Sequence, residues 1–188
     1  MEFLKQDIDF AILQYQSWQP IDTDKTAKGT KAPYYGNIAT ASALGNLTAG
    51  SVSVASIPLS SDMEAAYAIY VEGHLKRLVA INMHGYNTTV DGAGVAPLEN
   101  PEPRPHRAFS FLVGDDNSAD VHAGVRRLMA NGSDAITGIT FDGWSYNYEL
   151  DNGRPVKLSN VTTGESLESN KGVLSVLVPD SSAAILDI

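Results

Sequence analysis

The sequence contains no cysteine and is short of basic residues. Without cysteine the chain can form neither disulfide bonds nor catalytic thiolates. Its 13 Lys and Arg face 22 Asp and Glu, which gives a formal net charge of −9. Such a charge repels the phosphates of nucleic acids and anionic membrane surfaces, so we predict that neither is a partner.

Long hydrophobic runs are also absent. No apolar stretch approaches the roughly 20 residues of a membrane-spanning helix. The start of the chain, Met1 to Lys5, has neither the basic residues nor the uninterrupted apolar run of a secretory signal peptide. We therefore expect a globular chain with no membrane span, while its compartment stays open.

Residues for the common catalytic and metal sites are missing or wrongly spaced. There is no Gly-x-Ser-x-Gly motif, and the serines cluster in expected turns. The acidic segment from Asp115 to Asp120 lacks the alternating acids and the glycine of a calcium loop, so an acidic turn is the favoured interpretation. We expect no metal and no cofactor, because the histidines also lack the spacing of ligands: His74, His84, His106 and His122.

Paired carboxylates are the remaining route to hydrolysis, because glycosidases place two of them on either side of the scissile bond. The glutamates of the β-rich part fall at expected strand edges or turns: Glu64, Glu72, Glu99, Glu102, Glu149, Glu165 and Glu168. We interpret them as solvated surface acids and predict no catalytic residue in this chain.

The sequence does contain a strong β-strand pattern, centred on residues 64–83. Tyr67, Ile69 and Val71 recur at every second position in its first half, and Leu78 and Ala80 do so in its second. This period of two is typical of strands. A glycine between the halves can adopt the positive φ that a tight turn needs. We predict a central hairpin of an antiparallel sheet.

Further short apolar runs lie on both sides of the hairpin, separated by turn residues. We expect strands at residues 52–56, 108–113, 121–129, 135–140, 144–149, 172–178 and 183–187. Residues 84–106 are rich in proline and predict a long irregular loop. About nine short strands with frequent turns indicate a mainly β protein, an antiparallel β-sandwich.

The first 49 residues differ from this pattern. Apolar side chains at three- and four-residue spacing predict an amphipathic helix over residues 1–15. Polar residues 22–32 predict an exposed loop, and Pro33 suits the first turn of a helix over residues 34–44, which Gly45 ends. We place the boundary between the helical part, residues 1–49, and the β-sandwich, residues 50–188, near Gly50.

Three aromatic residues recur in the expected strand 144–149, namely Trp144, Tyr146 and Tyr148. Aromatic side chains on one sheet face either form part of a hydrophobic core or stack against sugar rings. The core is the favoured interpretation, and the sugar-binding one stays open.

Four N-glycosylation sequons fall at expected turns or loops, beginning at Asn46, Asn87, Asn131 and Asn160. They hint at a secretory protein, although turn-forming asparagines without modification explain them equally well.

Several segments together carry a family resemblance. They are Trp18-Gln19-Pro20 and residues 32–39, 44–50, 64–70, 79–83, 86–90, 125–128, 138–143 and 153–155, together with the final strand. In order and spacing they resemble glycoside hydrolase family 79, the β-glucuronidase-like family, over essentially the whole chain. The resemblance implies a secreted, retaining glycosidase that acts on β-glucuronides, built from a (β/α)8 barrel with a C-terminal β-sandwich beside it.

The resemblance also implies which parts this chain holds. The catalytic acid/base and nucleophile of the family lie on earlier barrel strands, upstream of these residues. Residues 1–49 would be the end of the barrel: a helix, the last strand around Tyr15–Gln19, its loop and the last helix. In the family, that loop helps to line the pocket for the sugar carboxylate. The corresponding positions are Tyr34, Tyr35 and Gly36, whose hydroxyl and amide groups can donate to a carboxylate.

Three hypotheses follow from these patterns. The favoured one is the C-terminal part of a β-glucuronidase-like enzyme, structural and inactive alone, with the catalytic barrel as its partner and β-glucuronide glycans reached only through the parent enzyme. The second is a carbohydrate-binding β-sandwich that uses the three aromatic residues. The third is a hydrolase assembled from this chain and a separate upstream chain.

Overall fold

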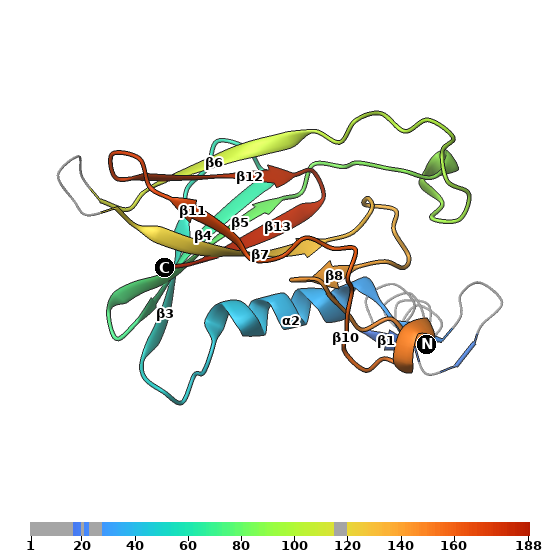
Figure 1. Ribbon diagram of the computed structural model, residues 1–188, viewed down its shortest axis with the longest axis horizontal. Helices are drawn as coiled ribbons and strands as arrows, with labels where there is room; N and C mark the ends of the chain where they lie inside the picture. Colours follow the sequence, from blue (N-terminus) through green and yellow to red (C-terminus); the bar gives the residue numbers. More distant parts are fainter. Residues whose placement is uncertain (1–16, 20, 23–27, 115–119) are drawn as a thin grey trace, which may run out of the picture.

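A computed structural model describes residues 17–19, 21–22, 28–114 and 120–188 (Figure 1). The helix predicted over residues 1–15 and most of the acidic segment 115–120 lie outside the described residues, so both stay predictions. In the described part the chain is mainly β, with antiparallel sheets, and the predicted fold class is confirmed.

The main sheet has the strand order β10-β9-β8-β7-β13-β5-β4-β3, and β11 pairs with β7 beside this path. Its strands are β3 (Val52–Ile57), β4 (Glu64–Val71), β5 (His74–Asn82), β7 (His122–Met129), β8 (Thr140–Phe141), β9 (Trp144–Ser145), β10 (Val156–Lys157), β11 (Glu165–Glu168) and β13 (Ser182–Asp187). The last strand of the chain, β13, lies between β5 and β7, so the sheet is complete only once the C-terminus is in place.

The predicted central hairpin is β4 and β5. Its turn has two consecutive residues with positive φ, Glu72 at 51° and Gly73 at 77°. That conformation matches the twist of the flanking strands. The hairpin faces alternate as expected, because Leu78 and Ala80 enter one core cluster while Val79 packs against the other.

A second, two-stranded sheet covers one face of the main sheet. It consists of β6 (His106–Leu112) and β12 (Val173–Pro179), which pair antiparallel along their whole length. The core between the sheets is built from side chains that are at most 7% exposed: Ala66, Ala68, Leu78, Ala80, Phe109, Phe111, Ala123, Val125, Leu174, Val176, Val178, Ala184 and Leu186. Burial of this apolar surface is the main force that holds the sandwich together.

Helix α2 (Ala32–Leu44) covers the opposite face of the main sheet, so that Figure 1 shows three successive layers. Pro33 lies in its first turn and Gly45, with φ of 73°, ends it, as predicted. Ala43 packs with Ile69 and Ile185 of the sheet in a second, smaller core cluster. The division near Gly50 stays a prediction, and α2 and the sheet share this core.

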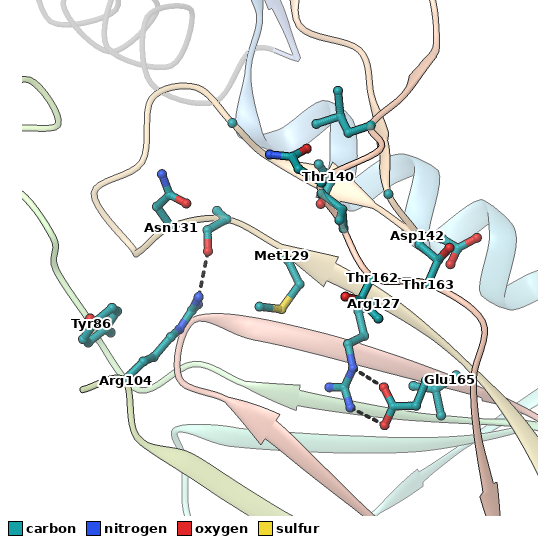
Figure 2. A pocket seen from close by; sticks show the side chains of 17 residues that line it. Tyr86, Arg104, Arg127, Met129, Asn131, Thr140, Asp142, Thr162, Thr163 and Glu165 are labelled. Carbon is teal, nitrogen blue, oxygen red and sulfur yellow. Dashed lines mark hydrogen bonds and ion pairs between the residues drawn. The ribbon is translucent and has the colours of Figure 1, made fainter. Parts of the chain in front are cut away.

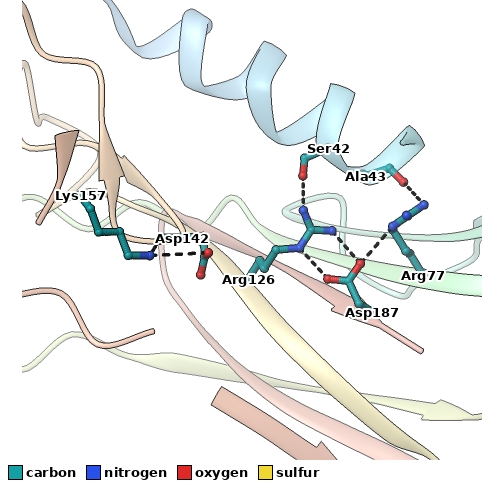
Figure 3. A network of polar contacts seen from close by, with 7 residues as sticks. All are labelled: Ser42, Ala43, Arg77, Arg126, Asp142, Lys157 and Asp187. Atoms are coloured by element: carbon teal, nitrogen blue, oxygen red, sulfur yellow. Dashed lines mark hydrogen bonds and ion pairs between the residues drawn. The ribbon is translucent and has the colours of Figure 1, made fainter. Parts of the chain in front are cut away.

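Two arginines of the sheet bind the C-terminal end of α2 (Figure 3). Arg77 Nη1 donates to the Ala43 carbonyl at 3.1 Å, and Arg126 Nη1 donates to the Ser42 hydroxyl. Both guanidinium groups also pair with Asp187, through Arg77 Nε at 3.0 Å and Arg126 Nη2 at 2.7 Å. Positive charge suits this position, because the last carbonyls of a helix carry a partial negative charge.

Several sequence-based expectations are wrong in the region 130–170. The strand predicted over residues 135–140 is reduced to β8, since Gly138 (φ 74°) keeps the chain in turns before it. The strand predicted over 144–149 ends at Ser145, and Tyr148–Asp151 form the helical turn α3. Strands β10 and β11 were not predicted, because two- and four-residue strands lack a readable period.

The N-terminal region differs from its prediction in one respect. The segment expected to be an exposed loop, residues 22–32, contains a short strand, β2 (Gly29–Thr30), which pairs antiparallel with β1 (Trp18–Gln19). Gly29 is buried there, against Tyr148 Cβ. Residues 84–106 are largely irregular, as predicted, with one 3₁₀ turn at Val90–Gly92.

Candidate functional site

The family-matched pair Tyr34-Tyr35 lies at the start of α2, and its two rings have different environments. Tyr35 is completely buried. Its hydroxyl donates to Asn147 Oδ1 at 2.8 Å, accepts from the Tyr146 backbone N–H at 2.8 Å, and lies 3.3 Å from Ser145 Oγ. Burial raises the pKa of Tyr35 above its ordinary value, so the phenol stays neutral. This hydroxyl fastens the 145–147 segment to α2.

Tyr34 is partly exposed and belongs to an aromatic cluster with Tyr35 and Tyr146. The centroid of its ring lies 5.6 Å from that of Tyr146 and 6.4 Å from that of Tyr35, both edge to face. Gly36 borders the apolar groove between α2 and the main sheet, and nothing lies within 4 Å of the position of an added Cβ. The structure thus brings the three family positions to one end of α2, and their substrate role stays a prediction.

The three aromatic residues of 144–149 do not form one face, contrary to the sequence-based expectation. Trp144 is 40% exposed on β9 and Lys157 Nζ lies 5.5 Å from its ring centroid. The Tyr146 ring packs with Tyr35 in the aromatic cluster at the start of α2. The Tyr148 ring packs against Trp18, with 5.8 Å between the ring centroids. A continuous platform for sugar rings is therefore absent from these residues, because the strand ends at Ser145.

A cavity of about 640 Å³, which we call the polar cavity after the charged side chains in its wall, lies between β7 and the segment 158–165 (Figure 2). Arg127 and Glu165 line it side by side and form a bidentate ion pair with distances of 2.7 and 2.8 Å. Arg104 donates to the carbonyls of Ala130, Asp180 and Ser181, and burial lowers its pKa from the ordinary value. The volume is that of a typical small-ligand site.

The carboxylates of the described chain are engaged separately. Glu64 lies 3.4 Å from His84 Nε2, a contact without hydrogen-bond geometry, since that buried nitrogen has no hydrogen-bond partner. Glu168 lies 3.6 Å from His122, and Glu165 is held by Arg127. Within the described ranges no group of three or more His, Asp or Glu is placed to hold a metal ion.

The four sequon asparagines, Asn46, Asn87, Asn131 and Asn160, are all exposed. Two of them, Asn131 and Asn160, border the polar cavity. Their modification stays a prediction. Where the chain is described, no helix has both the length and the apolar character to span a membrane.

Comparison with known proteins agrees with this architecture. Residues 66–185 match the model of the glycosyl hydrolase family 79 C-terminal beta domain, and this range contains most of both sheets. The chain belongs to glycosyl hydrolase family 79. The family 79 resemblance inferred from the sequence is thereby confirmed, and residues 66–185 are its C-terminal β-domain.

Two curated relatives of this family 79 chain are β-glucuronidases from fungi. The Aspergillus niger protein is 49% identical over 179 residues, and the Neurospora crassa protein is 46% identical over 200 residues. Each alignment covers 93% of this chain but only 32% and 36% of the respective relative. The chain thus spans about a third of the length of the relatives that it matches.

A solved structure shares the fold. It is a 4-O-α-L-rhamnosyl-β-D-glucuronidase from Fusarium oxysporum, in complex with Rha-GlcA, with a TM-score of 0.63 and 22% identity. The match covers 85% of this chain and 30% of that one. At this identity the likeness shows the fold of the family 79 chain and not its ligand.

No pattern in the sequence indicates the polar cavity. Its wall on β7 is made by Val125, Arg127 and Met129, which share one strand face at a period of two. The other wall comes from residues 158–165, which lead into β11. Because β11 was not predicted, the ion pair between Arg127 and Glu165 could not be predicted either. The one available signal was the sequon at Asn160, which places that segment at the surface.

Proposed function

We propose that this chain is the C-terminal portion of a β-glucuronidase-like glycosidase, in which it acts as a structural domain beside a catalytic (β/α)8 barrel and is not catalytic alone. The observation that carries the proposal is the match to the family 79 C-terminal beta domain in a chain that spans about a third of its relatives. On this proposal β-glucuronides are bound by the parent enzyme, and the catalytic glutamates come from its barrel.

The fold supports a structural role. Both faces of the main sheet are covered, one by β6 and β12 and the other by α2, and the charged side chains at the interface between α2 and the sheet are paired. Glu64, Glu165 and Glu168 each lie against a basic side chain, an arrangement that differs from two carboxylates flanking a sugar linkage.

Within the parent enzyme, Tyr34 and Gly36 are the positions that we propose to contact substrate. Tyr34 is partly exposed, and a phenol hydroxyl can donate to a sugar carboxylate. Tyr35 would act differently, because its hydroxyl already bonds to Tyr146 and Asn147. It would position the start of α2 rather than touch the sugar.

Hydrolysis of 4-nitrophenyl β-D-glucuronide tests this proposal. We expect no turnover by residues 1–188 alone, and turnover when the chain is co-expressed with a catalytic fragment from a family 79 relative. The catalytic fragment without this chain is the control. Turnover by the isolated chain, at a rate that scales with its concentration, would refute the structural role.

A carbohydrate-binding module is the second candidate, favoured by the 40% exposure of Trp144 in a family whose relatives act on glucuronides. Lys157 beside its ring adds a donor for sugar hydroxyls. Glycan-array binding that is lost in Trp144→Ala would support it. Trp18→Ala is the matched control, because Trp18 is equally exposed but packs at a tilt against the Tyr148 ring. Equal binding by both variants would exclude Trp144 as the platform.

A further inference from the structure

The polar cavity beside β7 is bordered by two sequon asparagines that come from opposite walls. Asn131 follows the end of β7, and Asn160 lies in the segment that leads to β11. Both side chains are exposed, and neither carboxamide has a hydrogen bond to another described residue.

The sequons differ in the state of their hydroxyl residue, which the glycosylating enzyme must recognise together with the asparagine. Thr89, in the sequon of Asn87, donates its hydroxyl to Asp134. Ser133, in the sequon of Asn131, accepts from the Tyr86 N–H at 2.9 Å and also contacts the Ser181 hydroxyl. Thr162, in the sequon of Asn160, is exposed and has no such partner among the described residues. Asn160 is therefore the cavity-bordering sequon whose hydroxyl residue makes no hydrogen bond within the described chain.

The charged groups of the cavity are already satisfied. Arg127 uses Nε and Nη2 on Glu165 and Nη1 on the Leu177 carbonyl, at 2.9 Å. Asp142 lies 3.7 Å from Lys157 Nζ. A charged ligand would have to displace these partners, whereas a neutral one loses nothing by leaving them in place. The remaining lining mixes threonine hydroxyls with apolar surface from Met129, Leu158 and Val161.

We propose that Asn160 is N-glycosylated and that the first N-acetylhexosamine of its glycan rests in this cavity. That sugar is neutral, carries hydroxyl and amide groups, and has an apolar ring face. It therefore matches a lining of threonine hydroxyls and aliphatic side chains around satisfied ion pairs. In the transfer, Asn160 Nδ2 bonds to the anomeric carbon of an oligosaccharide carried on a lipid pyrophosphate. The bond from that carbon to the pyrophosphate breaks, the lipid pyrophosphate departs, and the amide loses one proton.

The experiment is secretion of the chain from yeast behind an added leader, followed by peptide mass spectrometry and hydrogen exchange. We expect a glycan on Asn160, and slower amide exchange in residues 127–131 and 158–165 than in Asn160→Gln. Asn46→Gln is the matched control, because Asn46 is an exposed sequon at the end of α2, away from this cavity. It should leave the protection of both segments unchanged.

Two further variants separate the glycan from the side chain. Thr162→Ala abolishes the sequon while keeping Asn160, and should lose the protection as Asn160→Gln does. Thr162→Ser keeps the sequon and should retain the slow exchange of both segments. A chain glycosylated at Asn46 but unmodified at Asn160 would overturn the proposal. So would a glycan on Asn160 whose loss leaves exchange in both segments the same.

Discussion

At the scale of single residues, Tyr35 shows how one hydroxyl joins distant parts of the chain. Its partners, Ser145 and Asn147, are 110 and 112 residues away in sequence. No local sequence pattern could reveal these partners, so nothing in the sequence was a reason to assign Tyr34 and Tyr35 different roles. The packing separates them, with one ring buried and the other partly exposed.

Tyr35→Phe should destabilise the fold by about 1 to 3 kcal/mol, because it leaves the Tyr146 N–H and the Asn147 carboxamide oxygen without their partner. Urea unfolding followed by tryptophan fluorescence measures the change. Tyr34→Phe is the matched control and should cost much less, since its hydroxyl has no hydrogen bond within the described chain. Equal losses in the two variants would contradict the assignment of Tyr35 as a buried anchor.

Asp134 fastens the long loop 84–106 to the 130–138 turn region, and it gives this contact a pH dependence. The Thr89 hydroxyl, followed by the backbone N–H groups of Thr88 and Thr89, holds the pKa of Asp134 below its ordinary value. A depressed folded-state pKa contributes stability above the unfolded pKa. That contribution falls as pH drops from about 4 through the folded pKa.

Asp134→Asn should therefore be less stable than the parent chain at pH 7, and the difference should shrink below about pH 4. Thermal unfolding at a series of pH values checks this. Asp151→Asn, which changes an exposed acid in α3, is the control and should cost little stability at pH 7. A pH-independent gap for Asp134→Asn would mean that the ionised carboxylate is not what the Thr88 and Thr89 amides stabilise.

At the scale of elements, Gly73 in the β4–β5 turn allows the cost of backbone strain to be measured without a change in side-chain packing. An added Cβ at Gly73 would have no atom within 4 Å, but the φ of 77° is one that L residues avoid. Gly73→Ala should cost about 1 to 2 kcal/mol for this reason alone. Gly124→Ala in β7 is the control, because its Cβ also meets nothing within 4 Å and its φ is not positive. The two urea midpoints should differ, and identical midpoints would contradict the strain.

The elements also show which parts of the fold a sequence can predict. Strands β4, β5, β7 and β12 were predicted because each is long enough to display alternation against a buried face, and β13 because it is a short, nearly continuous apolar run. Residues 144–149 alternate equally well, yet only Trp144–Ser145 pair as a strand. Beyond Ser145 the backbone does not pair with a neighbouring strand, because the Tyr146 N–H donates to the Tyr35 hydroxyl instead. Tertiary contacts override the local pattern there.

At the scale of the whole molecule, the family could be predicted from the sequence, whereas the arrangement of its candidate sites could not. Ordered short motifs identified family 79, and the matched β-domain confirms it. The polar cavity depends on Arg127 of β7 meeting Glu165 of β11, 38 residues later, through strand pairing that the sequence did not indicate. The cores that join the three layers also consist of side chains from elements far apart in the sequence, so their contacts could not be predicted from local patterns.

Asp187 joins two of these layers, since Arg77 and Arg126 both pair with it while binding the end of α2 (Figure 3). Asp187→Asn removes the charge and should loosen the helix by about 1 kcal/mol, a modest value because the carboxylate is 38% exposed. Hydrogen exchange should accelerate in residues 36–44 and not in β12, which lies on the other face. Asp142→Asn is the control, because that acid pairs with Lys157 at 3.7 Å and with neither of the two arginines. Uniform acceleration across both faces would instead indicate global unfolding, and would contradict a local role for Asp187 in holding α2 on the sheet.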